Sequence, residues 1–99
     1  MKAIFDRHCC QWEPNIDYNL MFLRSIERHS NDKLKLRGYV TIFEVYESLG
    51  LKLDFKKLEN VKNPSDLWWS YRNNNKIDFG IMPIENTDIV CLNFNINID

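Results

Sequence analysis

The sequence predicts a single α+β domain of 99 residues, in which two main helices pack on a three-stranded antiparallel meander. Two helix-like segments fill the first half of the chain, and each of them is followed by a glycine, Gly38 or Gly50. Apolar and polar residues then alternate along Ile89 to Asp99, as in a half-buried strand. We therefore divide the domain into an N-terminal arm (1–14), a helical part (15–50) and a β-meander (66–99).

The first helix is expected to begin near Asn15 or Asp17, because both residue types are favoured at the N-cap and the acid suits the positive helix end. A short strand over Ala3 to Phe5 is expected before it, in the arm. Arg37 falls in the last turn, and Gly38 fits the left-handed position that ends many helices. The apolar residues with helical spacing are Ile16, Leu20, Leu23, Ile26 and Leu34.

The second helix has a sharper start signal. Thr41 and Glu44 match the capping box, in which a hydroxyl and a carboxylate satisfy reciprocal backbone donors. Gly50 is the expected C-cap. Residues 51–64, which follow, are compatible with either a short strand or a third amphipathic turn. The apolar stripe of the second helix consists of Ile42, Val45 and Leu49.

The residue pattern in the last third of the chain predicts three antiparallel strands, over Leu67–Tyr71, Ile77–Met82 and Ile89–Asp99. Turn-forming residues separate them, at Asn73–Lys76 and at 83–88. The many asparagines of this region are interpreted as compositional bias. One face of the last strand is apolar and consists of Val90, Leu92, Phe94, Ile96 and Ile98.

The charge of the chain is nearly balanced, with 13 basic and 14 acidic residues and a net charge of −1. A nucleic-acid-binding protein usually carries a strong basic excess, so direct nucleic-acid binding is not expected. The lysine run Lys52, Lys56, Lys57 and Lys62 is diluted by acids and is interpreted as a solvated face. This balance favours a protein or a small molecule as the partner.

No transmembrane helix is expected, since the apolar run Leu20–Leu23 is far shorter than the about 20 residues that span a bilayer. A signal peptide is not expected either, because Asp6 and Arg7 interrupt the N-terminal segment. We therefore expect a cytoplasmic protein with reduced thiols.

An enzymatic function is not expected. The sequence contains no glycine-rich phosphate loop, no nucleophile elbow and no His-Glu-x-x-His motif. The acid pair Glu44 and Glu47 lies on an expected helix face and is interpreted as solvated. General acid–base catalysis needs a tuned partner group, and none is evident.

One structural zinc ion is a possible cofactor. Its candidate ligands are Cys9, Cys10 and Cys91, together with His8 or His29. Such a site would tie the arm to the sheet and the first helix, which a small domain can exploit for stability. The alternative is three reduced, partly buried thiols without metal.

The aromatic residues Trp12, Trp68, Trp69 and Tyr71 are candidate partner-binding residues. Interface hot spots are enriched in tryptophan and tyrosine. Trp68 and Trp69 face opposite sides of a strand, so at least one is expected outside the main core. The alternative is that the outer one packs under the N-terminal segment.

Several short motifs resemble a small domain of unknown function from phages and integrative elements of Gram-positive bacteria. They are Asn31-Asp32-x-Leu-x-x-Arg-Gly, Glu44-Val45-Tyr46 with Leu49-Gly50, Asp78-Phe79-Gly80, and Leu92-Asn93-Phe94-Asn95. The resemblance covers roughly residues 15–98 and leaves the arm outside it.

Small orphan proteins of such elements often act on host defence. By this analogy, the resemblance implies an anti-CRISPR that binds a type II Cas nuclease and blocks DNA loading or cleavage. The alternative is an accessory or structural protein of a phage or mobile element that binds another protein. On either interpretation the protein acts by binding and not by catalysis.

Overall fold

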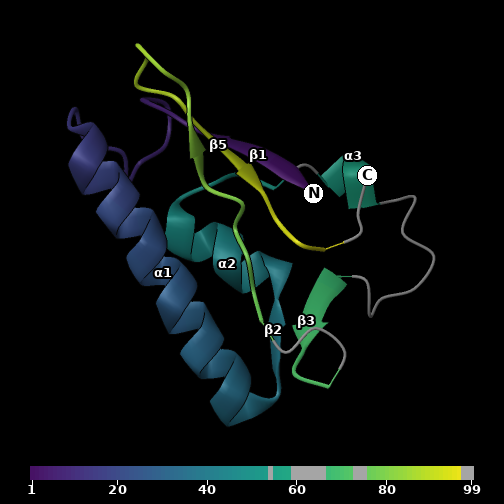
Figure 1. The fold of residues 1–99 in the computed structure, drawn as a ribbon. Coiled ribbons are helices and arrows are strands. Elements are labelled where there is room, and N and C mark those ends of the chain that lie inside the picture. The colour runs from purple at the N-terminus through teal and green to yellow at the C-terminus, as the bar shows by residue number, and fades with distance from the viewer. Residues whose placement is uncertain (54, 59–66, 73–75, 97–99) are drawn as a thin grey trace.

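The computed structural model describes residues 1–53, 55–58, 67–72 and 76–96. Their fold is α+β, with two main helices and antiparallel sheets, as predicted (Figure 1). The third helix is a single turn. In chain order the elements are β1 (Lys2–Phe5), α1 (Ile16–Arg37), β2 (Tyr39–Thr41), α2 (Ile42–Leu49), α3 (Phe55–Leu58), β3 (Trp68–Ser70), β4 (Met82–Pro83) and β5 (Val90–Asn93).

Both ends of α1 are set by the residues that the sequence indicates. The side chain of Asn15 accepts a hydrogen bond from the Tyr18 N–H at 3.1 Å and forms the N-cap. Gly38 has φ +88 and donates its N–H to the Leu34 carbonyl at 2.8 Å, so it forms the left-handed C-cap.

The capping box of α2 is present as predicted. The Thr41 hydroxyl accepts from the Glu44 N–H at 3.3 Å, and Glu44 Oε2 accepts from the Thr41 N–H at 2.9 Å. The same carboxylate oxygen lies 2.6 Å from Nη2 of Arg37, at the end of α1. One carboxylate therefore joins the two helices across β2, and Gly50 ends α2 in the left-handed conformation.

The predicted meander is only partly present. Sheet A has three antiparallel strands in the order β1-β5-β4, so its members include the N-terminal strand. The strand predicted over Leu67–Tyr71 exists as β3, but it pairs with β2 in a separate sheet B, with Trp69 opposite Val40. Sheet A therefore pairs the two ends of the chain, while sheet B follows α1.

The strand predicted over Ile77–Met82 is shortened to β4 for a physical reason. Side chains of α1 bind N–H groups of the segment before β4, while its carbonyls accept from the last strand and the residues after it, Asn93 N–H to Phe79 at 2.8 Å and Asn95 N–H to Asp78 at 3.0 Å. Asn31 Oδ1 accepts from the Ile77 N–H at 2.7 Å, and Glu27 Oε2 accepts from the Phe79 N–H at 2.8 Å. Ile77 and Phe79 of this segment are fully buried.

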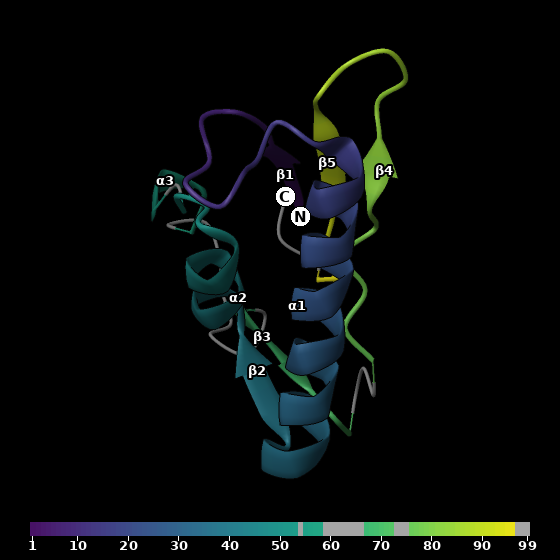
Figure 2. The ribbon, with the colours of Figure 1, turned by 90° about the vertical axis from the view of Figure 1, so that its left-hand side faces the viewer.

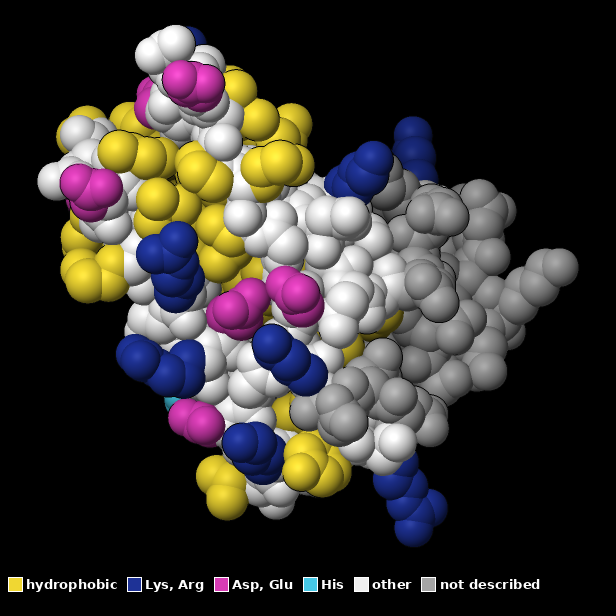
Figure 3. Space-filling view, viewed as in Figure 1, with side chains coloured by type: hydrophobic (Ala, Val, Ile, Leu, Met, Phe, Trp, Pro, Cys, Tyr) yellow, Lys and Arg dark blue, Asp and Glu magenta, His cyan; other side chains and the backbone are white. Residues whose placement is uncertain are grey.

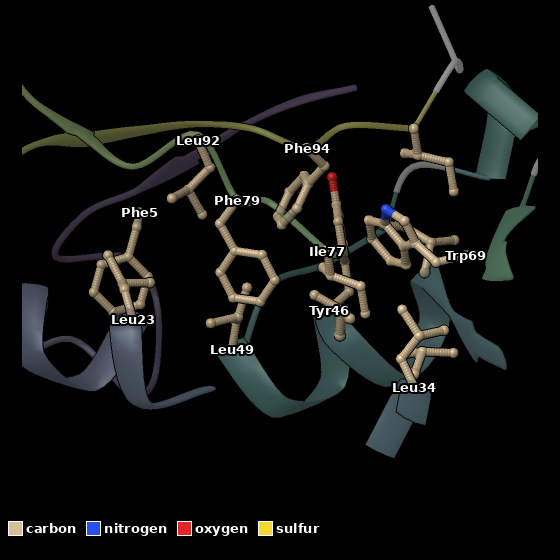
Figure 4. Close-up of a cluster of buried hydrophobic side chains, with 14 of the residues drawn as sticks. Phe5, Leu23, Leu34, Tyr46, Leu49, Trp69, Ile77, Phe79, Leu92 and Phe94 are labelled. Carbon is tan, nitrogen blue, oxygen red and sulfur yellow. The ribbon is translucent and has the colours of Figure 1, made fainter. Parts of the chain in front are cut away.

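The core lies between sheet A, α1 and α2 (Figures 2 and 4). In Figure 4, Phe5 and Leu23 form one end of the cluster, and Trp69 and Leu34 form the other. The alternation predicted for the last strand is confirmed over residues 90–96. The fully or almost fully buried residues of that strand are Val90, Leu92, Phe94 and Ile96.

Some predictions fall on residues that the structure does not describe. The turn at Asn73–Asn75, the residue Ile98 and residues 59–66 are among them. Of the alternatives left open for 51–64, the helical turn is present at α3. Among the described residues, no helix is long and apolar enough to span a bilayer.

Candidate functional site

The first candidate site is a groove on the outer face of sheet A. Strand alternation buries Phe5 and turns Ile4 outward. The register places Ile4 opposite Cys91, and Cys91 opposite Met82, so these three side chains form a row across the sheet. Ile4 and Met82 are 57% and 59% exposed. Hydrophobic side chains accordingly gather at the sheet A end of the molecule (Figure 3).

Two chain segments form the walls of this groove: residues 6–10 after β1, and residues 50–52 after α2. The two walls touch at Gly50, where a Cβ would lie 2.6 Å from the Cys10 sulfur. A glycine is therefore needed for this close approach as well as for its positive φ. The groove has a volume of about 1000 Å³.

Four of the five candidate zinc ligands line this groove: His8, Cys9, Cys10 and Cys91. The thiols turn in different directions, because Cys9 points to the Ile4 carbonyl (3.7 Å) and Cys10 to the Gly50 carbonyl (4.0 Å). His29 is exposed on α1 and does not line the groove.

No group of three or more potential ligands among the described residues is arranged to hold a metal ion. Burial also raises the pKa of the Cys9 thiol, which disfavours the thiolate that zinc needs. The zinc site stays a prediction. Elemental analysis of protein purified without a metal-affinity tag tests it.

The second candidate site is an aromatic surface around sheet B, which we define as Tyr39, Phe43, Trp68 and Tyr71. These side chains are between 38% and 47% exposed. Tyr39 and Trp68 lie on the outer face of β2 and β3, and the Tyr71 N–H donates to the Gly38 carbonyl at 3.0 Å. The Arg37 guanidinium lies 4.4 Å from the centre of the Tyr39 ring.

The other two candidate aromatics lie elsewhere. Trp69 belongs to the core and is 0% exposed, and its indole N–H donates to Asn95 Oδ1 at 2.8 Å. Trp12 is half-buried in the loop before α1 and donates to the Asp88 carbonyl at 3.3 Å. Trp68 and Trp69 thus face opposite sides of β3, as alternation predicts.

Three asparagines have structural roles that the sequence analysis missed. Asn19, which is 1% exposed, exchanges hydrogen bonds with the backbone of Glu13 at 2.9 and 2.7 Å. Asn31 does the same with Ile77, and Asn95 bonds Trp69, Asp78 and Lys76. The only signal for Asn19 and Asn31 in the sequence is an asparagine inside a helix, where it is otherwise unfavourable.

Searches of curated proteins and of solved structures found no match to this chain. A comparison with protein families found one that matches residues 2–99, from β1 to the last residue. The match therefore includes the N-terminal strand as well as both helices. The chain belongs to DUF6353, a family of unknown function.

Proposed function

We propose that the protein works by stoichiometric binding to another protein through the aromatic surface. The observation that carries this proposal is the exposure of four aromatic side chains on and beside one small sheet. Tyrosine and tryptophan supply most of the energy at many interfaces, because they bury large apolar areas and retain a polar group.

The aromatic side chains are carried by backbone that is anchored to the core, which also favours binding. Val40 of β2 and Trp69 of β3 lie on the inner face of sheet B, where they are buried and anchor the two strands to the core. The contact with Arg37 restrains the Tyr39 ring. A surface that is already ordered loses little conformational entropy on binding, so more of the contact energy becomes affinity.

As the partner we propose a type II Cas nuclease in the cytoplasm of the host cell, with inhibition of DNA loading or cleavage. The support for this partner is the resemblance carried by the motifs around Asn31, Tyr46 and Phe94. The net charge of −1 favours contact with a protein surface over mimicry of a DNA duplex. The alternative is an accessory protein of a phage or mobile element that binds a different protein.

A pull-down with the Cas effector of the host, followed by a cleavage assay, separates these two partners. Binding that suppresses cleavage supports the anti-CRISPR proposal. If the effector does not bind at micromolar concentration, the accessory role becomes the better proposal. The titration endpoint tests the mode of action, because a binder saturates near one to one, whereas an enzyme inactivates its target at much lower ratios.

Two variants and a matched control locate the surface. Trp68→Ala and Tyr71→Ala should each weaken partner binding by about tenfold or more. Tyr18→Ala is the control, because Tyr18 is as exposed as Tyr71, at 44% against 45%. Tyr18 lies in the first turn of α1, whereas sheet B follows the C-terminal end of that helix. Equal affinity for all three variants would place the interface elsewhere.

A further inference from the structure

Both faces of sheet A are apolar, and the two main helices cover one of them. On this inner face, Phe5 and Leu92 are buried and point toward α1 and α2 (Figure 4). On the outer face, Ile4 is 57% and Met82 is 59% exposed. An antiparallel sheet with a solvated face normally carries polar side chains there, so an apolar outer face indicates an interface. The apolar side chains of the outer face are those of Ile4, Met82, Ile84, Ile89 and Cys91.

Charged residues lie at the two ends of this outer face, with the apolar side chains between them. Lys2 is exposed at the start of β1, on the same face as the outward side chains of that strand. Asp6 follows the end of β1, and the turn between β4 and β5 carries the exposed acids Glu85 and Asp88 at that same end. Arg7 is next to Asp6, but the three acids outnumber it. One end of the face is therefore basic and the other acidic.

From these observations we propose that two copies of the chain dimerise through their outer faces, about a two-fold axis that runs along the row Ile4–Cys91–Met82. Each side chain of the row then meets its own copy. This axis reverses the strand direction, so the basic end of each copy lies over the acidic end of the other, with Lys2 facing Asp6 of the second copy. An axis parallel to the strands would instead bring the two acidic ends together, and like charges at an interface are unfavourable.

The dimensions of the face set the strength of this dimer. Sheets that pack face to face lie about 10 Å apart, so the side chains of the two rows fill the layer between them. Stable interfaces bury about 1200–2000 Å² in total, and strands of two to four residues offer a smaller area. We therefore expect a dissociation constant in the micromolar range. The aromatic surface lies elsewhere, so the proposal does not depend on the proposed protein partner.

Sedimentation velocity tests the dimer, on reduced protein from micromolar to millimolar concentration. The protein carries no N-terminal tag, because the Met1 ammonium group donates to the carbonyls of Phe94 and Ile96 at 3.2 and 3.0 Å. We expect the sedimentation coefficient to rise from the monomer value to the dimer value across this range. A monomer at every concentration would overturn the proposal.

Arginine substitutions locate the interface. Ile4→Arg and Met82→Arg each place a charge against its own copy at the axis, so each should weaken dimerisation about tenfold or more. Both positions are exposed, so near-UV circular dichroism should stay native. Leu36→Arg is the control, because Leu36 is 90% exposed but lies in the last turn of α1. If the natively folded Ile4→Arg and Met82→Arg proteins dimerise as tightly as the wild type, the dimer does not use this face and the proposal is wrong.

Cross-linking tests the direction of the axis. In a Cys9→Ser, Cys10→Ser background Cys91 is the one remaining thiol, and a short bismaleimide should join it to Cys91 of the second copy. With Cys91→Ser added, Ile4→Cys and Met82→Cys should each cross-link to its own copy, whereas Leu36→Cys should not. If Ile4→Cys cross-links only to Met82→Cys when the two proteins are mixed, the axis runs along the strands and the proposed arrangement is wrong.

A charge exchange tests the contact between the two ends. Lys2→Glu and Asp6→Lys should each weaken dimerisation about fivefold, because each places like charges opposite one another. The double variant restores opposite charges and should dimerise like the wild type. Within one copy the two residues are about 13 Å apart along an extended chain, so a contact between them cannot explain the recovery. If the natively folded double variant dimerises no better than the single variants, Lys2 does not face Asp6 of the second copy.

Discussion

Single side chains connect segments that are distant in the sequence. The caps at Asn15, Gly38, Thr41 and Gly50 could be predicted, because each partner lies within a few residues along the chain. The bonds of Asn31 and Asn95 could not, since their partners lie up to 46 and 26 residues away. The position of Asn31 inside a helix is unusual for an asparagine, but nothing in the sequence indicates which distant residue it binds.

Glu44 makes stability depend on pH. The carboxyl pKa of Glu44 is about 2, below the ordinary 4.5. The hydrogen bond with Arg37 is the largest cause, and the hydrogen bonds with Thr41 lower the pKa further. The stabilisation is complete above about pH 4.5 and is lost as the pH falls toward 2. Glu44→Gln should therefore lower the free energy of unfolding by about 1 kcal/mol at pH 7 and by almost nothing near pH 2.

Urea unfolding at both pH values, followed by circular dichroism, measures this difference. Glu47→Gln on the same helix is the control and should unfold like the wild type at both. A pH-independent loss in Glu44→Gln would show that the charge is not the source of the stabilisation.

Asn31 should not tolerate aspartate. The substitution keeps the shape but replaces the donor to the Ile77 carbonyl (2.9 Å) with a carboxylate oxygen, close to Glu27. We expect a loss of about 2 kcal/mol in urea unfolding at pH 7, because two acceptors then face each other. Asn86→Asp, in an exposed turn with φ 63, should cost little. Similar losses in both variants would contradict the role of Asn31.

At the scale of elements, alternation predicted which residues of the strands are buried but not which strands pair. Val90, Leu92 and Phe94 are buried as expected. The partner of β3 proved to be β2, because sheet membership depends on contacts between distant segments. Both candidate sites depend on such pairing, so the sequence identified many of their residues but neither the groove nor the aromatic surface as a unit.

Gly80 shows how closely the segment before β4 approaches β5. Its φ is +58, and a Cβ there would lie 2.4 Å from the Asn93 carbonyl oxygen. Gly38 has φ +88, but a Cβ would meet nothing within 4 Å. Gly38→Ala should therefore cost about 1 kcal/mol for the left-handed backbone, and Gly80→Ala about 1–3 kcal/mol more.

Thermal and urea unfolding of the two alanine variants compares these costs directly, since both positions share the positive φ. Equal losses would mean that the backbone conformation, and not the contact with Asn93, makes glycine necessary at position 80.

At the scale of the whole molecule, the N-terminal strand is part of the sheet. All four residues of β1 pair with β5, and Phe5 is fully buried. The sequence correctly suggested a short strand over Ala3 to Phe5, but assigned it to an arm because nothing local indicates its partner. Residues 6–15 remain a loop between β1 and α1.

Two neighbouring residues of β1 test this assignment. Phe5→Ala should lower the free energy of unfolding by about 3–5 kcal/mol, as expected for truncation of a buried aromatic side chain. Ile4→Ala, on the exposed face of the same strand, should cost less than about 1 kcal/mol. Urea unfolding followed by circular dichroism measures both. A small loss for Phe5→Ala would mean that the fold is stable without β1.

The pairing of β1 with β5 also governs when this domain can fold during its synthesis. The contacts of α1 with β2 and α2 are local in sequence and can form while translation continues. β1 is synthesised well before β5, so its pairing must wait until β5 has emerged from the ribosome. Until then the apolar residues of β1 are open to chaperones or to neighbouring nascent chains, so slower translation of β5 should prolong chaperone contact at residues 2–5.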